Sequence, residues 1–208
     1  MKALLLKDLY HLKSYLRVLA VMAVFYLIFG LTSRNSTMFS SIIMMFAVML
    51  PVSLFSYDDY AKWDAYCLSL PVSRRQVVTA RYLLALLALA VCGLLSAAVM
   101  VVQQRLQPDV ESEGGWYALG MIASVAVLYL AVALPLCYKL GVEKGRFLLM
   151  ALIAVPFVGF LLLSQLGIDP PSEEQMLFWM GAVLPVMAVA LLIFSYLLSV
   201  YFYQRKEF

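Results

Sequence analysis

The stretch from Tyr82 to Gln104 reads YLLALLALAVCGLLSAAVMVVQQ and contains no charged residue. An α-helix needs about 20 mostly apolar residues to cross the hydrocarbon layer of a membrane, so this stretch predicts a membrane-spanning helix. Charged residues separate it from five further uncharged runs, at 18–33, 35–57, 114–138, 147–168 and 175–204. The sequence therefore predicts six transmembrane helices, near 16–32, 38–56, 82–103, 116–138, 147–166 and 176–202.

The composition leads to the same class. Of the 208 residues, 65% are hydrophobic and 13% are charged, and the mean hydropathy is +0.94. A soluble domain has about 45–50% apolar and about 25% charged residues, and a soluble fold of this size cannot bury so much apolar surface in one core. The period-2 alternation of a transmembrane β-barrel is absent. We therefore expect an all-α integral membrane protein whose residues 1–208 form a single transmembrane domain.

The distribution of basic residues predicts the orientation. With six spans both termini lie on one side of the membrane, and that side holds 13 of the 15 Lys and Arg residues. They lie in the N-terminal segment and at the start of the first span, in the 57–81 loop, in the 139–146 loop and in the C-terminal tail. The opposite side has only Arg34 and Arg105. Because basic loops stay in the cytoplasm, we expect both termini to be cytoplasmic.

Several motifs are missing. The chain has no G-x-x-x-x-G-K-[ST] phosphate loop, so we do not expect it to be an enzyme that hydrolyses ATP by itself. No expected span has Asp, Glu, Lys, Arg or His near its centre, which disfavours an ion-coupled carrier and a membrane-embedded protease or lipid transferase. We expect neither catalytic nor metal-binding residues.

The N-terminal segment 1–15 predicts an amphipathic helix on the membrane surface. Leu5, Leu9 and Leu12 continue to Leu16 as one apolar stripe, while Lys7 lies on the other face. The segment and the start of the first span supply four residues expected at anionic headgroups, namely Lys2, Lys7, Lys13 and Arg17. A simpler reading, compatible with this one, is that the lysines only set the topology.

The 57–81 loop mixes aromatic, acidic and basic residues, beginning YDDYAKWDAYCLSLPVSRR. An acid at Asp58 or Asp59 favours a helix start, so we expect a short amphipathic helix over 58–68 that presents Tyr60, Trp63 and Cys67 on one side. Such aromatics beside charges are typical of partner surfaces. The alternative is a solvated loop whose Trp63 is anchored in the headgroup layer, and physics alone leaves both open.

The end of this loop predicts a second helix. Pro71 ends the first helix, because proline cannot continue it. Ser73 followed by Gln76 has the spacing of a capping box, and the helix that starts there runs on into the third span. The loop is therefore expected to project below the membrane as helix, break and helix.

The order of motifs resembles a known family. The segments LLLKDLY (4–10), DDYAKWD (58–64) and LSLPVSRR (68–75) are similar to those of small bacterial ABC-2-type transporter permeases, including the six-helix permeases of phenol-soluble-modulin exporters. The resemblance implies that the loop supplies a coupling helix that docks on a separate ATP-binding subunit. The matching residues are Asp58, Asp59, Lys62, Trp63, Asp64, Leu68, Leu70, Pro71, Arg74 and Arg75. Unlike some larger exporters of this type, the chain has only a short turn at 167–175.

The resemblance also implies a function. We expect the permease subunit of an ATP-driven exporter in the bacterial plasma membrane, moving a hydrophobic or amphipathic peptide, lipid or drug. ATP and Mg would be bound by the partner ATPase, with no cofactor on this chain. The other partners would be a second permease copy or a sister permease and membrane lipid, without nucleic acid. The alternatives are a non-transporting membrane scaffold or sensor subunit, and an ATP-independent channel or carrier.

Overall fold

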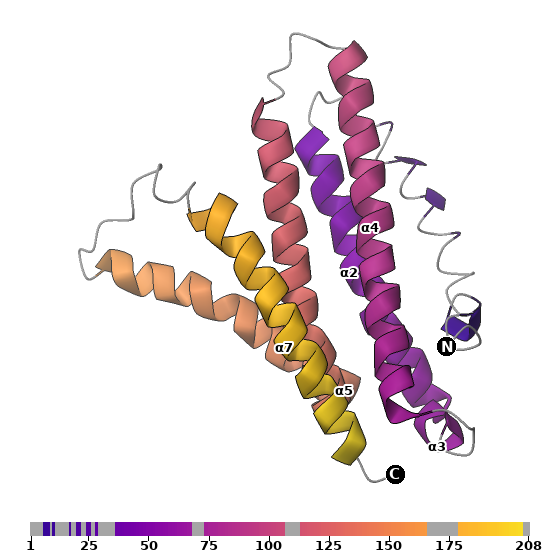
Figure 1. Cartoon of the computed structure of the whole chain (residues 1–208). Coiled ribbons are helices and arrows are strands. Elements are labelled where there is room, and N and C mark those ends of the chain that lie inside the picture. The colour runs from indigo at the N-terminus through magenta and orange to yellow at the C-terminus, as the bar shows by residue number, and fades with distance from the viewer. Residues whose placement is uncertain are drawn as a thin grey trace.

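The computed structural model describes residues 6–8, 10, 17, 20, 21, 24, 25, 28, 36–67, 73–106, 113–165 and 179–205. Throughout these residues the regular structure is helical (Figure 1). The elements are α2 (Ser36–Tyr60), α3 (Trp63–Cys67), α4 (Arg74–Leu106), α5 (Glu113–Gln165), η1 (Trp179–Val183) and α7 (Leu184–Arg205). The all-helical prediction is confirmed for this part of the chain.

Four helical segments in the described residues are long and apolar enough to cross a membrane. They are Met38–Tyr60, Arg74–Leu106, Gly114–Gly145 and Gly181–Arg205. Four of the expected spans, those near 38–56, 82–103, 116–138 and 176–202, fall on these segments, which makes the chain a multi-pass membrane protein. The expected first span, 16–32, lies largely outside the described residues, and the fifth, 147–166, falls on the second part of α5.

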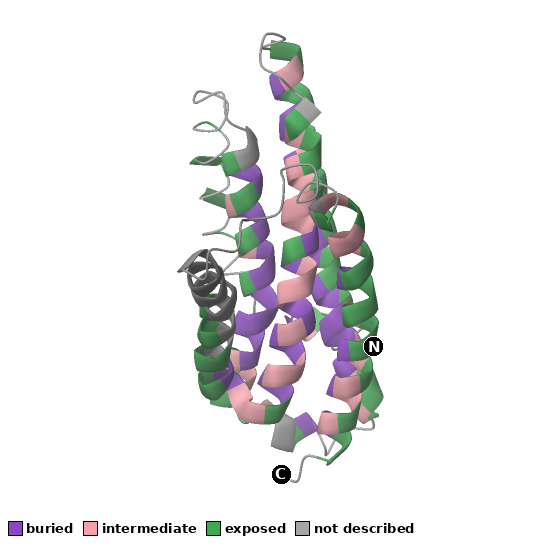
Figure 2. Ribbon diagram, turned by 90° about the vertical axis from the view of Figure 1, so that its left-hand side faces the viewer, coloured by how far each residue is buried: buried purple, intermediate pink, exposed green. Residues whose placement is uncertain are grey.

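The helices pack around an apolar core, of which the main cluster of buried residues joins α2, α4, α5 and α7. Its fully buried side chains include Val78 of α4, Leu130 and Leu134 of α5 and Tyr203 of α7. Large apolar side chains also cover the outer faces, where Leu94 of α4 is 73% exposed. Figure 2 shows this arrangement, with buried residues toward the inside and exposed ones outside. An outer surface this apolar suits lipid as its solvent.

The expected loop at 139–146 is instead a sharp kink inside α5. Only Gly141 leaves the helical conformation, with φ 77° and ψ 174°. That region of backbone space is essentially restricted to glycine, so one residue is enough to turn the chain. The two arms of α5 diverge from this point, which lies at the same end of the bundle as α3 (Figure 1). We call this end the loop end.

The start of α7 is a single π-helical turn, η1, with a chemical cause. Pro185 has no N–H to donate to the carbonyl of Gly181, and its ring crowds that carbonyl. The turn therefore widens over Trp179–Val183. Gly181 lies against α5 so closely that a Cβ atom there would be 2.6 Å from the Tyr117 hydroxyl oxygen.

Candidate functional site

The 57–81 loop begins later than predicted, because α2 extends to Tyr60. The Ala61 N–H donates to the Tyr57 carbonyl at 2.9 Å and the Lys62 N–H to the Asp59 carbonyl at 3.2 Å. Lys62 takes a left-handed conformation, φ 47°, which is a common way to end a helix. The prediction of a helix starting at Asp58 or Asp59 is therefore wrong.

The next helix, α3, covers only Trp63–Cys67. The prediction that Tyr60, Trp63 and Cys67 lie on one side of this helix is also wrong, since Tyr60 is 92% exposed whereas Cys67 is 3% exposed. No helix starts at Asp58 because its side chain turns inward to a cationic partner, described below. That contact outweighs the unfavourable placing of an acid at the C-terminal end of a helix.

The capping box at the start of α4 is confirmed. The Gln76 N–H donates to the Ser73 hydroxyl at 3.3 Å, and the Ser73 N–H donates back to the Gln76 side-chain oxygen at 3.2 Å. From there α4 continues without a break to Leu106, as the sequence predicts. The 57–81 loop is thus rigidly joined to a membrane-spanning helix.

Arg74 connects this helix start to the end of α7. Its guanidinium donates to the carbonyl oxygen of Gln204 at 2.6 Å and to that of Tyr203 at 3.3 Å. These are among the carbonyls that the end of a helix leaves without an internal donor, and a cation there also complements the helix dipole. Arg75, the next residue, is exposed.

Hydroxyl groups join α4 to α7 one turn further along. The Tyr82 hydroxyl lies 2.6 Å from the Ser195 oxygen and 2.8 Å from the Ser199 oxygen, and the Thr79 hydroxyl lies 2.9 Å from that of Tyr196. The rings of Tyr82 and Tyr196 meet edge to face, with centroids 5.4 Å apart. This contact was not predicted from the sequence. The available signal was the i, i+4 pair of serines within an otherwise apolar span, a pattern that places both on one helix face.

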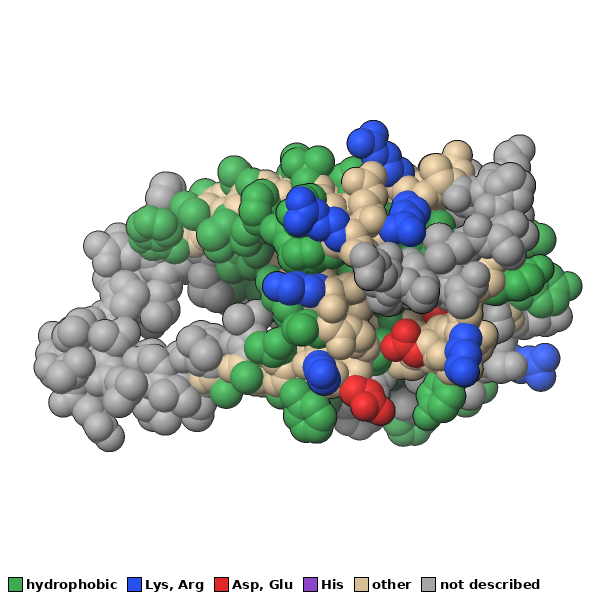
Figure 3. Space-filling model, turned by 90° about the horizontal axis from the view of Figure 1, so that it is seen from below, with side chains coloured by type: hydrophobic (Ala, Val, Ile, Leu, Met, Phe, Trp, Pro, Cys, Tyr) green, Lys and Arg blue, Asp and Glu red, His purple; other side chains and the backbone are tan. Residues whose placement is uncertain are grey.

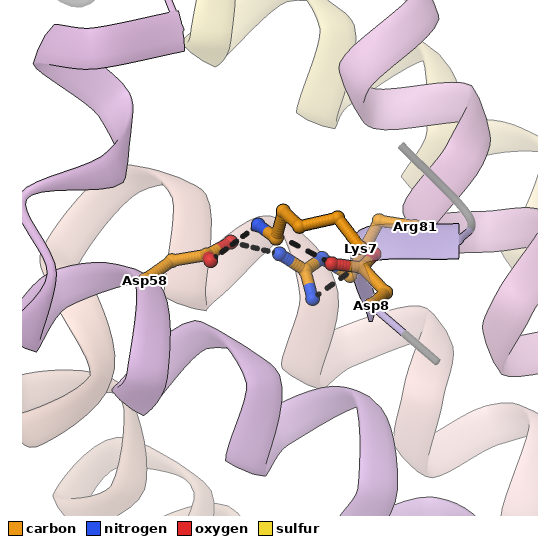
Figure 4. A network of polar contacts seen from close by, with 4 residues as sticks. All are labelled: Lys7, Asp8, Asp58 and Arg81. Carbon is orange, nitrogen blue, oxygen red and sulfur yellow. Dashed lines mark hydrogen bonds and ion pairs between the residues drawn. The ribbon is translucent and has the colours of Figure 1, made fainter. Parts of the chain in front are cut away.

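Four charged side chains form a closed ring at the base of the loop (Figure 4). The Lys7 ammonium nitrogen lies 2.6 Å from a carboxylate oxygen of Asp58 and 3.3 Å from one of Asp8. Arg81 completes the ring, with its Nη1 atom 3.6 Å from Asp8 and its Nη2 atom paired with Asp58. Arg81 and Asp8 are each 4% exposed. We refer to Lys7, Asp8, Asp58 and Arg81 as the charge ring.

Lys7 thus lies in a different environment from the one expected. Its side chain is 17% exposed within the charge ring, and its ammonium nitrogen lies 3.9 Å from the centroid of the Trp63 ring. The residue was expected at lipid headgroups because its helix face is polar, but that face meets Asp58 and α3. Arg17 is exposed, and Lys2 and Lys13 lie outside the described residues.

The other expected docking residues are divided between exposed and undescribed positions. Asp59, Lys62 and Arg75 are exposed, and Trp63 is half-buried. The side chain of Asp64 and all of Leu68, Leu70 and Pro71 lie outside what the structure describes. Figure 3 views the loop end directly and shows Lys and Arg side chains spread over it, with fewer acidic ones. This end is a charged surface suited to a protein partner.

A cavity of about 620 Å³ lies between α2 and α5. Its lining includes four methionines, namely Met44, Met45, Met49 and Met150, together with Ser53 and Tyr129. Apolar walls with a few polar groups are typical of small-molecule sites. Methionine also adapts to ligands of different shape. Among the described residues, no group of three or more His, Cys, Asp or Glu side chains is arranged to hold a metal ion.

The comparison with known protein families assigns the chain to a family. Residues 3–204 match the family described as ABC-2 family transporter protein, which covers almost the whole chain. No curated protein and no solved structure matches it significantly. The four apolar spans of the described residues agree with this match, and the chain therefore belongs to the ABC-2 transporter family and is an ABC-2-type permease.

Proposed function

We propose that this permease is the membrane subunit of an ATP-driven exporter in the bacterial plasma membrane, with six spans and both termini in the cytoplasm. A separate ABC ATPase binds ATP and Mg and docks on the 57–81 loop. Two permease subunits, either identical or sister chains, enclose the pathway. ATP binding closes the ATPase dimer, and the loop passes the resulting motion to the membrane helices.

The proposal is supported chiefly by the way in which the base of the 57–81 loop is fixed to the membrane helices. Its tip presents the exposed side chains of Tyr60 and Lys62, whereas its base is held by the charge ring and by the capping box that begins α4. A loop that served only to connect two spans would need no such anchoring. An exposed tip on a fixed base is what a docking element requires, because preorganisation lowers the cost of binding.

The lining of the cavity between α2 and α5 supports the proposal that the substrate is hydrophobic or amphipathic. Its four methionines accept apolar groups of varied shape. We propose that an apolar portion of the substrate contacts these residues during transport.

Co-purification in detergent with the ABC ATPase encoded beside the permease tests the proposal. Arg75→Glu reverses an exposed charge at the loop end of α4, and Arg105→Glu makes the same change at the other end of this helix. We expect the ATPase to co-purify with the wild type and with Arg105→Glu but to be reduced at least about tenfold with Arg75→Glu. Failure of the wild type to bind the ATPase would refute the proposal in favour of a scaffold, channel or carrier.

A further inference from the structure

The charge ring joins three separate parts of the chain. Lys7 and Asp8 come from the N-terminal segment, Asp58 from the last turn of α2 and Arg81 from α4. Positive and negative groups alternate around it, so each charge has two opposite neighbours and the ring is neutral. Removing one charge from such a buried set leaves another uncompensated, which is costly. The ring therefore specifies one arrangement of the three parts.

Lys7 is the member of the ring that also contacts α3. Its ammonium nitrogen is 2.6 Å from the Asp58 carboxylate and, at the same time, 3.9 Å from the Trp63 ring centroid. A cation over an indole ring is attracted by the negative face of the ring. A displacement of α3 that carries Lys7 along therefore disturbs the ion pairs of the charge ring.

Arg81 is the residue through which a displacement of the charge ring reaches α4 and α7. It stands on α4, one residue before Tyr82, whose hydroxyl contacts Ser195 and Ser199 of α7. Arg74, at the start of the same helix, caps the end of α7. These contacts make the loop-end parts of α4 and α7 one unit, so a force on Arg81 acts on both helices.

We propose that Lys7 and Asp8 are positioning residues of the coupling device, which hold α3 against the charge ring so that its displacement reaches α4 and α7. The proposal rests on the function proposed above. It gives the N-terminal segment a part in energy transfer in addition to any part in membrane contact. Lys7 contacts the Trp63 ring and pairs with Asp58. Asp8 pairs with Arg81 and so keeps the Arg81 side chain in the charge ring.

The first test uses the permease alone. In a Trp116→Phe/Trp179→Phe background, Trp63 is the single tryptophan. The double variant Lys7→Gln/Asp8→Asn removes one charge of each sign and leaves the neutral Asp58–Arg81 pair in place, so the fold is retained. We expect quenching of Trp63 fluorescence by acrylamide to rise about twofold, because the indole loses its covering cation. Unchanged quenching would overturn the positioning role.

The second test uses the complex with the ABC ATPase encoded beside the permease. At equal amounts of complex, Lys7→Gln/Asp8→Asn should lower the stimulation of ATP hydrolysis by the permease about tenfold. Lys7→Arg alone, which keeps the cation, should retain the stimulation, and Lys144→Gln, which removes an exposed charge at the same end, should not alter it. Full stimulation in the double variant would overturn the inference while leaving the proposed function intact. Absence of any wild-type complex would overturn both.

Discussion

Asp58 at the end of α2 and Arg81 near the start of α4 form an ion pair across the base of the 57–81 loop. Both ends of the loop are thereby fixed to each other, and the Arg81 guanidinium also lies 4.8 Å from the centroid of the Phe55 ring. A fixed base is what allows a short helix such as α3 to transmit a displacement without merely flexing.

The first prediction concerns the stability of this pair. Asp58→Asn or Arg81→Gln alone leaves the charge ring with a net charge in a buried place, and each should lower the free energy of unfolding by about 3 kcal/mol. The double variant keeps the neutral Lys7–Asp8 pair and should cost less than the sum of the two. SDS-induced unfolding in mixed micelles measures these values.

The exposed neighbour Asp59 provides the control for that experiment. Asp59→Asn should change the free energy of unfolding by less than about 0.5 kcal/mol. Strict additivity of Asp58→Asn and Arg81→Gln would contradict the coupling of the two side chains.

The second prediction concerns the hydroxyl contacts between α4 and α7. Tyr82→Phe removes the hydroxyl that lies between Ser195 and Ser199 and should cost about 1 kcal/mol, the size found for hydrogen bonds between membrane helices. Tyr201→Phe, at a half-exposed tyrosine of α7, should be neutral in the same unfolding assay. Equal effects of the two changes would contradict a special role for Tyr82.

The third prediction concerns the kink of α5. No heavy atom surrounds the site of a Cβ at Gly141, so Gly141→Ala introduces no collision and tests the backbone alone. Its φ of 77° is strained for alanine, and we expect a loss of about 1–3 kcal/mol in the free energy of unfolding. Gly120, within the regular part of α5, is equally open. Gly120→Ala should stabilise the protein by about 0.5–1 kcal/mol. If Gly141→Ala were also stabilising, the positive φ at the kink would be contradicted.

The fourth prediction concerns the cavity between α2 and α5. Val125→Trp narrows it, since Val125 is one of its lining residues. Export of a fluorescent amphipathic peptide from cells should fall at least about fivefold if the substrate occupies this space. Leu94→Trp enlarges a side chain on the outer face of α4 and should leave export unchanged. Undiminished export by Val125→Trp would exclude this cavity from the pathway.

The apolar runs of the sequence predicted the positions of the four membrane-spanning segments found in the described residues, because the bilayer imposes their length. The capping box of Ser73 and Gln76 could also be predicted, since it depends only on residues three apart. The end of α2 could not be predicted from the sequence. Asp58 looks like a helix start when judged by its neighbours, and its true role depends on Arg81, which lies 23 positions later.

The charge ring was hidden from the sequence for the same reason. Lys7 was interpreted from the pattern of one helix, which shows a polar face but not what covers it. The partner Asp58 lies 51 positions from Lys7, and pairings at such distances follow from tertiary packing. The kink at Gly141 was read as a loop because charged residues interrupt the apolar runs there, whereas its φ is visible only in the structure.

Site-specific photo-crosslinking in cells tests whether the 57–81 loop docks on an ATPase. A photoreactive amino acid is placed at Lys62, on the exposed turn before α3, or at Arg105, exposed at the other end of α4. We expect a cross-linked product with the mass of permease plus ATPase from position 62 and none from position 105. Absence of the product at position 62, or equal products at both positions, would contradict this docking.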